Sequence, residues 1–476
     1  MTANRHFTLL RPLRLLRLLL LFAGKRGVAG PGPPPKCAST TEHCADGSEN
    51  MTFQTPCCNM SEQCVAQDST EAWCVEKPPL APNRSRYSVL WNSPWPSECE
   101  QHEGGSGRPI DWSAVGVEVN DETAFNGEVV VDLYRTGIFP SFFRNGTVVN
   151  GGLPQSPKFS LAAHLAALTI VINEDVPSND FRGVGVLDFE DWYPQWNWHG
   201  PPHLPAGDIY WNESIKLAAA TDRTLKGAAL LAAAKAAWLE GAQDVMVATI
   251  NHVKRMRPYG VWGYYDAMLP PDDCVATASV GGSAHAQDIG MENPCSVGND
   301  DLPRLWEAVG AIMPSIYLST NASSNQGDVD SKVSEAARLA AGVSTRRADG
   351  SAPLVLPFAC AMYGHWQEEG VVHAYTHWLD TADAMVDFAR PAEWGAAGVV
   401  AWAGSVATYR KKTCAAGRVA FDNVLSPVLK DLAARTSTCA NGRCNSHGRC
   451  VTLPKIACIC DAGWAGVSCQ TQLRSV

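Results

Sequence analysis

The chain has 476 residues, of which 46% are hydrophobic and 18% charged, and its formal net charge is −10 at pH 7. The apolar fraction is that of a globular protein, and the length exceeds one ordinary domain, although a single barrel can take up about 250 residues. The acidic balance gives no reason to expect a nucleic-acid partner. It does not exclude a polyanionic substrate, because steering depends on the local field in a cleft.

Residues 1–30 have the features of a secretory signal, with arginines ahead of a short apolar core at 18–23. The core is too short for a membrane span, so no span is expected after processing. Cleavage near Ala23 and cleavage near Gly30 both remain open. No apolar tail follows Cys469, which argues against a lipid anchor.

Cysteine content and glycosylation sequons indicate an oxidising compartment. The chain has 17 cysteines, a number typical of secreted proteins or of proteins delivered to a lysosome-like compartment. Six Asn-x-Ser/Thr sequons are candidate glycosylation sites: Asn50, Asn59, Asn83, Asn145, Asn212 and Asn321.

A cysteine-rich module is expected at residues 37–76, between Pro-rich linkers at 31–35 and 77–82. Its six cysteines include the adjacent pair Cys57 and Cys58, a pattern that resembles knottin-like mini-domains. So short a segment needs such cross-links to fold. Six cysteines allow fifteen connectivities, and the role of the module is not evident from its sequence.

The central region alternates strand-like and helix-like runs, which predicts parallel strands and a (β/α) barrel. The expected strands are 127–132, 185–188, 258–265, 314–317, 353–357 and 398–402, and the clearest helices are 225–243 and 333–341.

Two acids, Asp188 and Glu190, follow the apolar run 184–187. Because side chains alternate along a strand, both acids lie on one face and Phe189 on the other. Placing two acids at the end of a buried strand is costly unless they have a task. The alternative is a strand that simply leaves the core for solvent.

Three aromatic residues, Tyr265, Tyr317 and Trp402, also end predicted strands. Barrel enzymes carry their chemistry at the C-terminal ends of their strands. The convergence of acids and aromatic residues at these ends therefore predicts an active site there.

The cysteine spacing at residues 439–470 resembles that of an epidermal-growth-factor-like module. This resemblance implies bridges joining Cys439 with Cys450, Cys444 with Cys458, and Cys460 with Cys469. Residues 435–438 lack the acidic set of the calcium-binding subtype, so no calcium is expected.

Seven segments occur in the order in which they occur in the animal and venom hyaluronidases, and residues 87–430 resemble that family. The segments are 89–92, 151–155, 188–198, 257–265, 314–317, 356–357 and 397–402. The resemblance implies a distorted TIM-like (β/α) barrel with small disulfide-rich modules at both ends. It also implies an endo-acting hydrolase that cleaves β-1,4 N-acetylhexosaminide bonds of hyaluronan, with no cofactor and no metal.

The mechanism follows from the spacing of the two acids. Asp188 and Glu190 are about 7 Å apart along one strand and cannot flank a sugar. An ordinary pair completed by Asp191, Asp266 or Asp380 stays open at this point. The resemblance implies instead that the substrate's acetamido group is the nucleophile, as in the substrate-assisted glycosidases.

The resemblance also implies residue roles. Glu190 is the general acid and then the base, with Trp192 expected to shield it from water, and Asp188 holds the acetamido N–H. Tyr265 and Tyr317 orient the acetamido group. Trp402 forms the floor of the cleft, and Tyr134 matches a further cleft tyrosine less closely, because two residues are missing after it.

Further bridges are implied by the family pattern, Cys99 with Cys414 and Cys274 with Cys295. Cys360 is then left over as a buried, inert thiol.

Two departures from the family bear on the substrate. Tyr193 stands where the family usually has Arg, and residues 199–205 form an insertion after the active-site strand. Loss of a cation weakens binding of a polyanion or changes preference, so chondroitin is a second candidate substrate. A catalytically weak or silent glycosaminoglycan-binding or adhesion protein is the alternative. Candidates for a basic groove are 254–257, 346–347 and 410–412.

Overall fold

The computed structural model describes residues 62–66, 72–76, 86–95, 110–176, 178–201, 203–268, 298–319, 325–346, 351–364, 366–368, 371–373, 375, 377–403, 411–461 and 463–472. The chain divides into two compact units, Met1–Glu76 and Lys77–Val476. In the first unit, β1 (Glu62–Ala66) pairs antiparallel with β2 (Ala72–Glu76). The expected signal segment 1–30 lies outside the described residues, as does most of the module expected at 37–76.

The second unit is built on two sheets of parallel strands. The five-stranded sheet has the order β11 (Leu354–Val355), β10 (Ala311–Met313), β9 (Val261–Tyr265), β8 (Val184–Leu187) and β5 (Val130–Leu133). The four-stranded sheet has the order β12 (Phe358–Cys360), β15 (Gly398–Trp402), β3 (Ser88–Trp91) and β4 (Val117–Val119).

The two sheets meet at both of their ends. At one end, only Leu356 and Pro357 separate β11, in the five-stranded sheet, from β12, in the four-stranded sheet. The amide of Leu356 donates to Ile312 O of the first sheet, and Pro357 O accepts from the amide of Val400 in the second. At the other end, the buried Asn120 side chain joins β4 to β5: its Oδ1 accepts from the amide of Val130 and its Nδ2 donates to Val130 O, both at 2.9 Å. The sheets form a distorted barrel, as expected.

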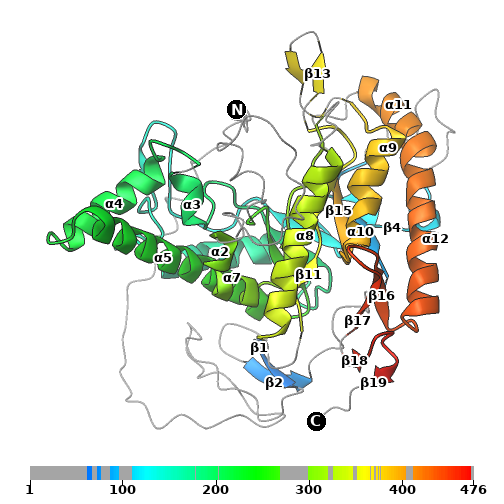
Figure 1. Ribbon diagram of the computed structural model, residues 1–476, viewed down its shortest axis with the longest axis horizontal. Coiled ribbons are helices and arrows are strands. Elements are labelled where there is room, and N and C mark those ends of the chain that lie inside the picture. Colours follow the sequence, from blue (N-terminus) through cyan, green and yellow to red (C-terminus); the bar gives the residue numbers. More distant parts are fainter. Residues whose placement is uncertain are drawn as a thin grey trace. The chain divides into compact units, whose positions relative to one another are not determined.

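Helices flank the strands on both sides in Figure 1. They are α2 (Leu161–Asp175), α3 (Trp196–His199), α4 (Ile209–Thr221), α5 (Gly227–Met256), α7 (Pro303–Ala308), α8 (Asn325–Ser344), α9 (Thr381–Ala384), α10 (Arg390–Glu393), α11 (Lys411–Ala420) and α12 (Ser426–Arg443). None of the helices in the described ranges is both long enough and apolar enough to span a bilayer.

Short elements complete the second unit. The hairpins are β6 (Ser141–Phe142) with β7 (Val148–Val149), β13 (Trp366–Glu368) with β14 (Val371–His373), β16 (Gly448–Val451) with β17 (Ala457–Cys460), and β18 (Trp464–Ala465) with β19 (Thr471–Gln472). Single turns of 3₁₀ or π helix are η2 (Ser113–Val115), η3 (Asp121–Thr123), η4 (Met385–Ala389) and η5 (Phe421–Leu425).

The barrel interior is apolar at its base and polar where the strands end. Val130, Val184 and Val186 belong to one buried cluster inside the sheets, and Tyr265 and Trp402 pack on that cluster from the strand ends. A second, larger cluster lies between sheets and helices. Since side chains alternate along each strand, the inward-facing residues that follow these valines form the floor of the candidate site.

The strand expected at 314–317 begins earlier than predicted. The structure places β10 at Ala311–Met313, and beyond it only Ser315 forms a bridge, to Phe358. Pro314 has no amide hydrogen, so it cannot donate to the ladder at this point.

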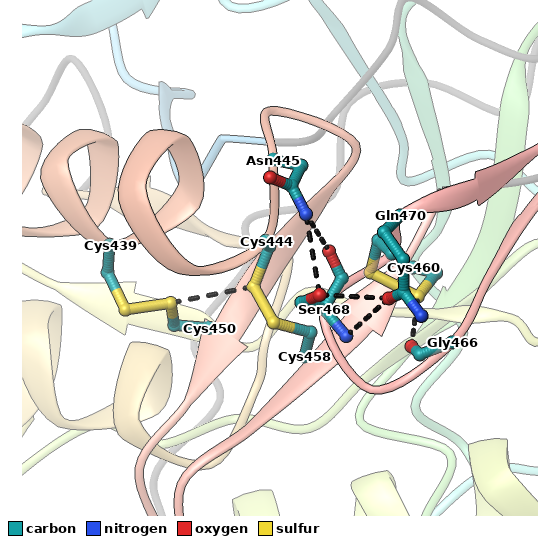
Figure 2. Close-up of a disulfide and its surroundings, with 10 residues drawn as sticks. Cys439, Cys444, Asn445, Cys450, Cys458, Cys460, Gly466, Ser468 and Gln470 are labelled. Carbon is teal, nitrogen blue, oxygen red and sulfur yellow. Dashed lines mark hydrogen bonds between the residues drawn. A yellow bond between two sulfur atoms is a disulfide. The ribbon is translucent and has the colours of Figure 1, made fainter.

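The C-terminal module contains the three bridges expected from its spacing. Figure 2 shows Cys439 bonded to Cys450 and Cys444 to Cys458. The third bridge joins Cys460 to Cys469. Asn445 Nδ2 donates to Ser468 O at 2.8 Å and fixes the last loop. Because Cys439 lies within α12, that helix runs through the boundary expected at residue 439.

Backbone contacts hold this module against the barrel. Arg449 Nε donates to Gly395 O at 2.9 Å, and the amides of Thr452 and Leu453 donate to Glu393 O at 2.8 and 2.9 Å. The module is therefore a docked part of the second unit.

Of the remaining cysteine predictions, the structure describes only the one for Cys360. Cys360 is a buried free thiol, and burial raises its pKa well above the usual range, as expected for an inert cysteine. Cys99, Cys274 and Cys295 lie outside the described residues, so the bridges implied for them stay predictions.

Candidate active site

Asp188 and Glu190 leave the end of β8 on one face. The amide of Asp188 still donates to Leu133 O of β5 at 3.1 Å, so its backbone is fixed by the sheet. Asp188 is half-buried and Glu190 is exposed. Phe189 faces the opposite way and stacks on Phe139 with ring centroids 4.0 Å apart. The alternation expected from the sequence is present.

Trp192 lines the same small pocket as Glu190, but Glu190 itself is exposed. The Trp192 ring is buried, with Nε1 donating to Pro140 O at 2.8 Å, and it packs edge-on against Trp238. The indole is therefore packed into the core beside the pocket.

A third carboxyl group, Asp132 of β5, lies under these two acids. It is 3% exposed, and its side chain accepts one hydrogen bond, from Asn92 Nδ2 at 3.3 Å. Burial first, and then the charge of Glu190, raise the pKa of Asp132 to about 8. The sequence analysis overlooked it, although Asp132 ends the strand predicted at 127–132 and the alternation argument applied to Asp188 applies equally to it.

Aromatic rings form one side of the site. Tyr317 stacks on Trp402 with centroids 5.8 Å apart and an interplanar angle of 14°, and Tyr265 lies 6.4 Å from Tyr317. Tyr375 stands edge-on to Trp402 at 4.9 Å. The sequence analysis did not identify Tyr375, whose φ of +54° places it in an irregular segment without a motif. Tyr265, Tyr317 and Trp402 are brought together as expected.

Tyr134 lies at the same end of the barrel. Its side chain is half exposed, it stacks on Phe125, and it forms a hydrogen bond with Trp402. Burial and then the negative charges of Asp132, Asp188 and Glu190 raise the pKa of Tyr134 well above its usual range. Tyr134 therefore lies near the three acids.

Tyr193 pairs with an acid instead of contributing a positive charge. Its hydroxyl donates to Asp266 Oδ2 at 2.8 Å, and Asp266 Oδ1 accepts from the amide of Ser315 at 3.0 Å. Burial raises the pKa of Asp266 to about 6, against the opposing charge of Lys332. Glu190, Tyr193, Tyr265 and Asp266 line one small pocket, whose lining in the described structure contains no basic residue.

The other open acid candidates have different surroundings. Asp380 is the N-cap of α9, and its Oδ1 accepts from the amide of Asp383 at 2.9 Å. Asp191 is exposed, and its charge acts on Tyr210. Of the three, Asp266 alone lines the pocket with Glu190.

The insertion at 199–205 supports Tyr193 from behind. His199 is buried, with Nδ1 2.6 Å from Asp208 Oδ2 and Nε2 2.7 Å from Tyr193 O. His203 stacks on Trp198, which in turn packs on Tyr193 at 4.8 Å. The insertion therefore fixes the backbone that carries Tyr193.

A buried amide network ties the loop after β8 to the loop after β9. Gln195 Nε2 donates to Ala267 O at 2.9 Å and to Asn299 Oδ1 at 2.7 Å. Asn299 Nδ2 donates in turn to Glu335 Oε1 of α8 at 2.9 Å. Together with the Tyr193–Asp266 bond, this network holds the two loops in one position.

The basic groove expected from the sequence does not include residues 254–257 or Arg346. Lys254 donates to Ala308 O at 3.0 Å, and Arg257 lies at the end of α5, which leads into the N-terminal end of β9. Arg346 pairs with Glu307 at 2.5 Å, just after α8. Both helices end where strands begin, opposite the site. The side chains of 410–412 are outside the described structure.

Two of the expected glycosylation sites can be placed. Asn145, in the turn between β6 and β7, and Asn212, on α4, are exposed. The other four, Asn50, Asn59, Asn83 and Asn321, are not among the described residues. Within the described ranges, no group of three or more His, Cys, Asp or Glu side chains is arranged to hold a metal ion.

The sequence matches a known family over most of its length. The family model described as Hyaluronidase covers residues 75–469. Hyaluronidase-1 from Mus musculus is 30% identical over 384 residues, which is 78% of this chain and 76% of the relative. A hyaluronidase from Crotalus adamanteus is 29% identical over 386 residues, 79% of this chain and 78% of the relative.

A solved structure has a similar fold. Bee venom hyaluronidase aligns with a TM-score of 0.58 and 27% identity, covering 72% of this chain and 99% of that one. The same protein in complex with a hyaluronic acid tetramer aligns with the same score, covering 73% and 99%.

Proposed function

The chain is a glycoside hydrolase of the hyaluronidase family, and from that premise we propose that it cleaves the β-1,4 N-acetylhexosaminide bonds of hyaluronan. The bee venom relative forms a complex with a hyaluronic acid tetramer, which supports the choice of polymer. Cleavage is endo-acting and uses the substrate's acetamido carbonyl oxygen as the nucleophile.

One observation carries the mechanism: both strand-end acids project from one face of β8. About 7 Å of strand separates them, so they stand on the same side of a bound sugar. Two carboxylates that act as an ordinary pair flank the scissile bond. Asp266, the open candidate that lines the pocket, already accepts hydrogen bonds from Tyr193 and Ser315.

The roles of the acids follow from their exposure. Glu190 is exposed and can reach a glycosidic oxygen, so it donates the proton to the leaving group and then removes one from water. Asp188 is half-buried beneath it, accepts the acetamido N–H, and stabilises the positive charge of the oxazolinium-like intermediate. The two displacements together retain the anomeric configuration.

The aromatic wall supplies positioning. Tyr265 and Tyr317 are half-buried with their hydroxyl groups hydrogen-bonded to each other, a geometry suited to orienting the acetamido group. Trp402, held flat by Tyr317 and edge-on by Tyr375, offers its face to the apolar side of a sugar ring. Tyr134 closes the cleft beside Trp402.

Secretion fits the same picture. Three bridges in the C-terminal module indicate folding in an oxidising compartment. We infer that the protein is secreted or delivered to a lysosome-like compartment and glycosylated at its exposed sequons.

Size-exclusion chromatography of hyaluronan and of chondroitin, each incubated with the protein from acidic to neutral pH, tests the activity. We expect shortened hyaluronan without a new unsaturated bond, and the faster substrate identifies the preference. De-N-acetylated hyaluronan tests the mechanism, because removing the acetyl group removes the nucleophile. Cleavage of that polymer at an undiminished rate contradicts substrate assistance. Binding of intact polymers without any shortening favours the adhesion-protein alternative.

A further inference from the structure

The buried Asp132 carboxyl destabilises the fold, and neither core packing nor the proposed catalytic roles explain why an acid stands at this position. The carboxyl group is 3% exposed, and burying a carboxyl with few partners destabilises a protein. Asp132 Oδ1 and Asn92 Oδ1 are both buried, and neither has a hydrogen-bond partner in the described structure. A buried acceptor without a donor is unfavourable, and protonation turns the Asp132 carboxyl into a donor.

The register places Asp132 one layer below the catalytic acids. Asp132 is the Cα partner of Val186, two residues before Asp188, and Leu133 O accepts from the amide of Asp188 at 3.1 Å. Side chains alternate along both strands, so Asp132, Val186 and Asp188 point to the same side of the sheet.

The charged surroundings of Asp132 are acidic. The titratable groups that interact with Asp132 are Glu190, after the end of β8, and Tyr134, from its own segment, and Asp188 acts on the same Tyr134. The residue that contacts Asp132 from the end of β3 is the neutral Asn92. No cation is among the groups that act on Asp132 in the described structure. Like charges so arranged favour one shared proton over full ionisation.

We propose that Asp132 is a positioning residue that shares a proton with Glu190 and so keeps the general acid supplied with its proton into the neutral pH range. The inference rests on the proposed role of Glu190.

The exchange is balanced. Asp132 gives its proton and becomes a carboxylate as Glu190 becomes a carboxylic acid, which then protonates the leaving oxygen. Glu190 regains a proton from the attacking water, and the pair returns to its starting state. One proton stays on the pair because burial, and then the charge of Glu190, raise the pKa of Asp132.

Asp132→Asn is the decisive variant, because it keeps the shape and the partner Asn92 but cannot take part in the exchange. We expect kcat/KM on hyaluronan to be nearly unchanged at acidic pH. The decline of kcat/KM on the alkaline side of its pH profile (the alkaline limb) should move to lower pH by about one unit or more. Asn126→Ala is the matched control: Asn126 Oδ1 accepts from the Asp132 amide at 2.8 Å without touching its carboxyl, so the limb should stay in place. A uniform loss at all pH values, with the limb unmoved, overturns the proposal.

A spectroscopic measurement keeps this test independent of turnover. Infrared difference spectra of wild type minus Asp132→Asn should show a carboxylic-acid C=O band at pH 6 that disappears on titration towards the alkaline range. Subtraction cancels other buried acids such as Asp387, whose pKa burial also raises. Absence of this band contradicts a protonated Asp132. If the asparagine variant does not fold, Asp132→Ser serves instead. An inactive wild type that shows the band refutes the proposed function but not the protonation of Asp132.

Discussion

Asp266→Asn should gain unfolding free energy relative to wild type as pH rises. Asp266 carries two hydrogen bonds, from the Tyr193 hydroxyl and the Ser315 amide. Burial nevertheless raises its pKa to about 6 from the usual 3.8. The folded state therefore holds this proton to higher pH than the unfolded chain does. Stability is lost as pH rises through the interval between the two values and is constant above it.

The magnitude follows from the shift. A rise of about two pKa units corresponds to about 3 kcal/mol of unfolding free energy, an upper limit because Asp266 is only half-buried. Asparagine cannot ionise, so its own cost from altered hydrogen bonds is the same at every pH. The unfolding free energy of the variant minus that of wild type should increase by up to about 3 kcal/mol between pH 4 and pH 6.

Urea denaturation at a series of pH values from 3.5 to 7.5 measures this difference. Tyr193→Phe is the matched control, because it removes the donor at 2.8 Å and keeps the carboxyl. Without that donor the ionised form is less favoured, so the control should lose stability mainly above pH 6. Parallel stability curves for wild type and Asp266→Asn across this range would refute the reasoning.

Other substitutions test the cleft and the barrel. Trp402→Ala removes the ring that stacks on Tyr317 at 5.8 Å. We expect affinity for full-length hyaluronan to fall about tenfold, a loss of about 1.4 kcal/mol. Unchanged affinity would exclude Trp402 from the floor of the cleft. Asn120→Ala removes the side chain that links β4 to β5 and leaves buried backbone groups unpaired, so unfolding free energy should fall by about 3 kcal/mol or more. Asn120→Asp keeps an acceptor for the amide of Val130 but loses the donor to Val130 O, so it should also lose stability.

Features that depend on local spacing were predictable from the sequence. The alternation at Asp188, Phe189 and Glu190 sets which side chains share a face, and the structure has that arrangement. Alternating strands and helices led to the barrel, and cysteine spacing led to the three bridges of the C-terminal module. The cap at Asp380 was also within reach, because an acid immediately ahead of a helix is a common N-cap.

Features that depend on tertiary pairing were not predictable from the sequence. Asn92 and Asp132 are 40 positions apart, and Tyr193 and Asp266 are 73 apart. Each pair forms because strands bring their C-terminal ends together, and one sequence without covariation holds no sign of the partner. The role of Asn120 is likewise set by the tertiary structure, because its side chain, and not a backbone ladder, joins β4 to β5.

The central claim is that Glu190 donates the proton in a hyaluronan hydrolase. The most direct test compares wild type with Glu190→Gln by size-exclusion chromatography of hyaluronan and by equilibrium binding of the intact polymer. We predict that wild type shortens the polymer, whereas the variant leaves its length unchanged and binds it with nearly the same affinity. Continued shortening of hyaluronan by the variant would contradict the assignment of Glu190.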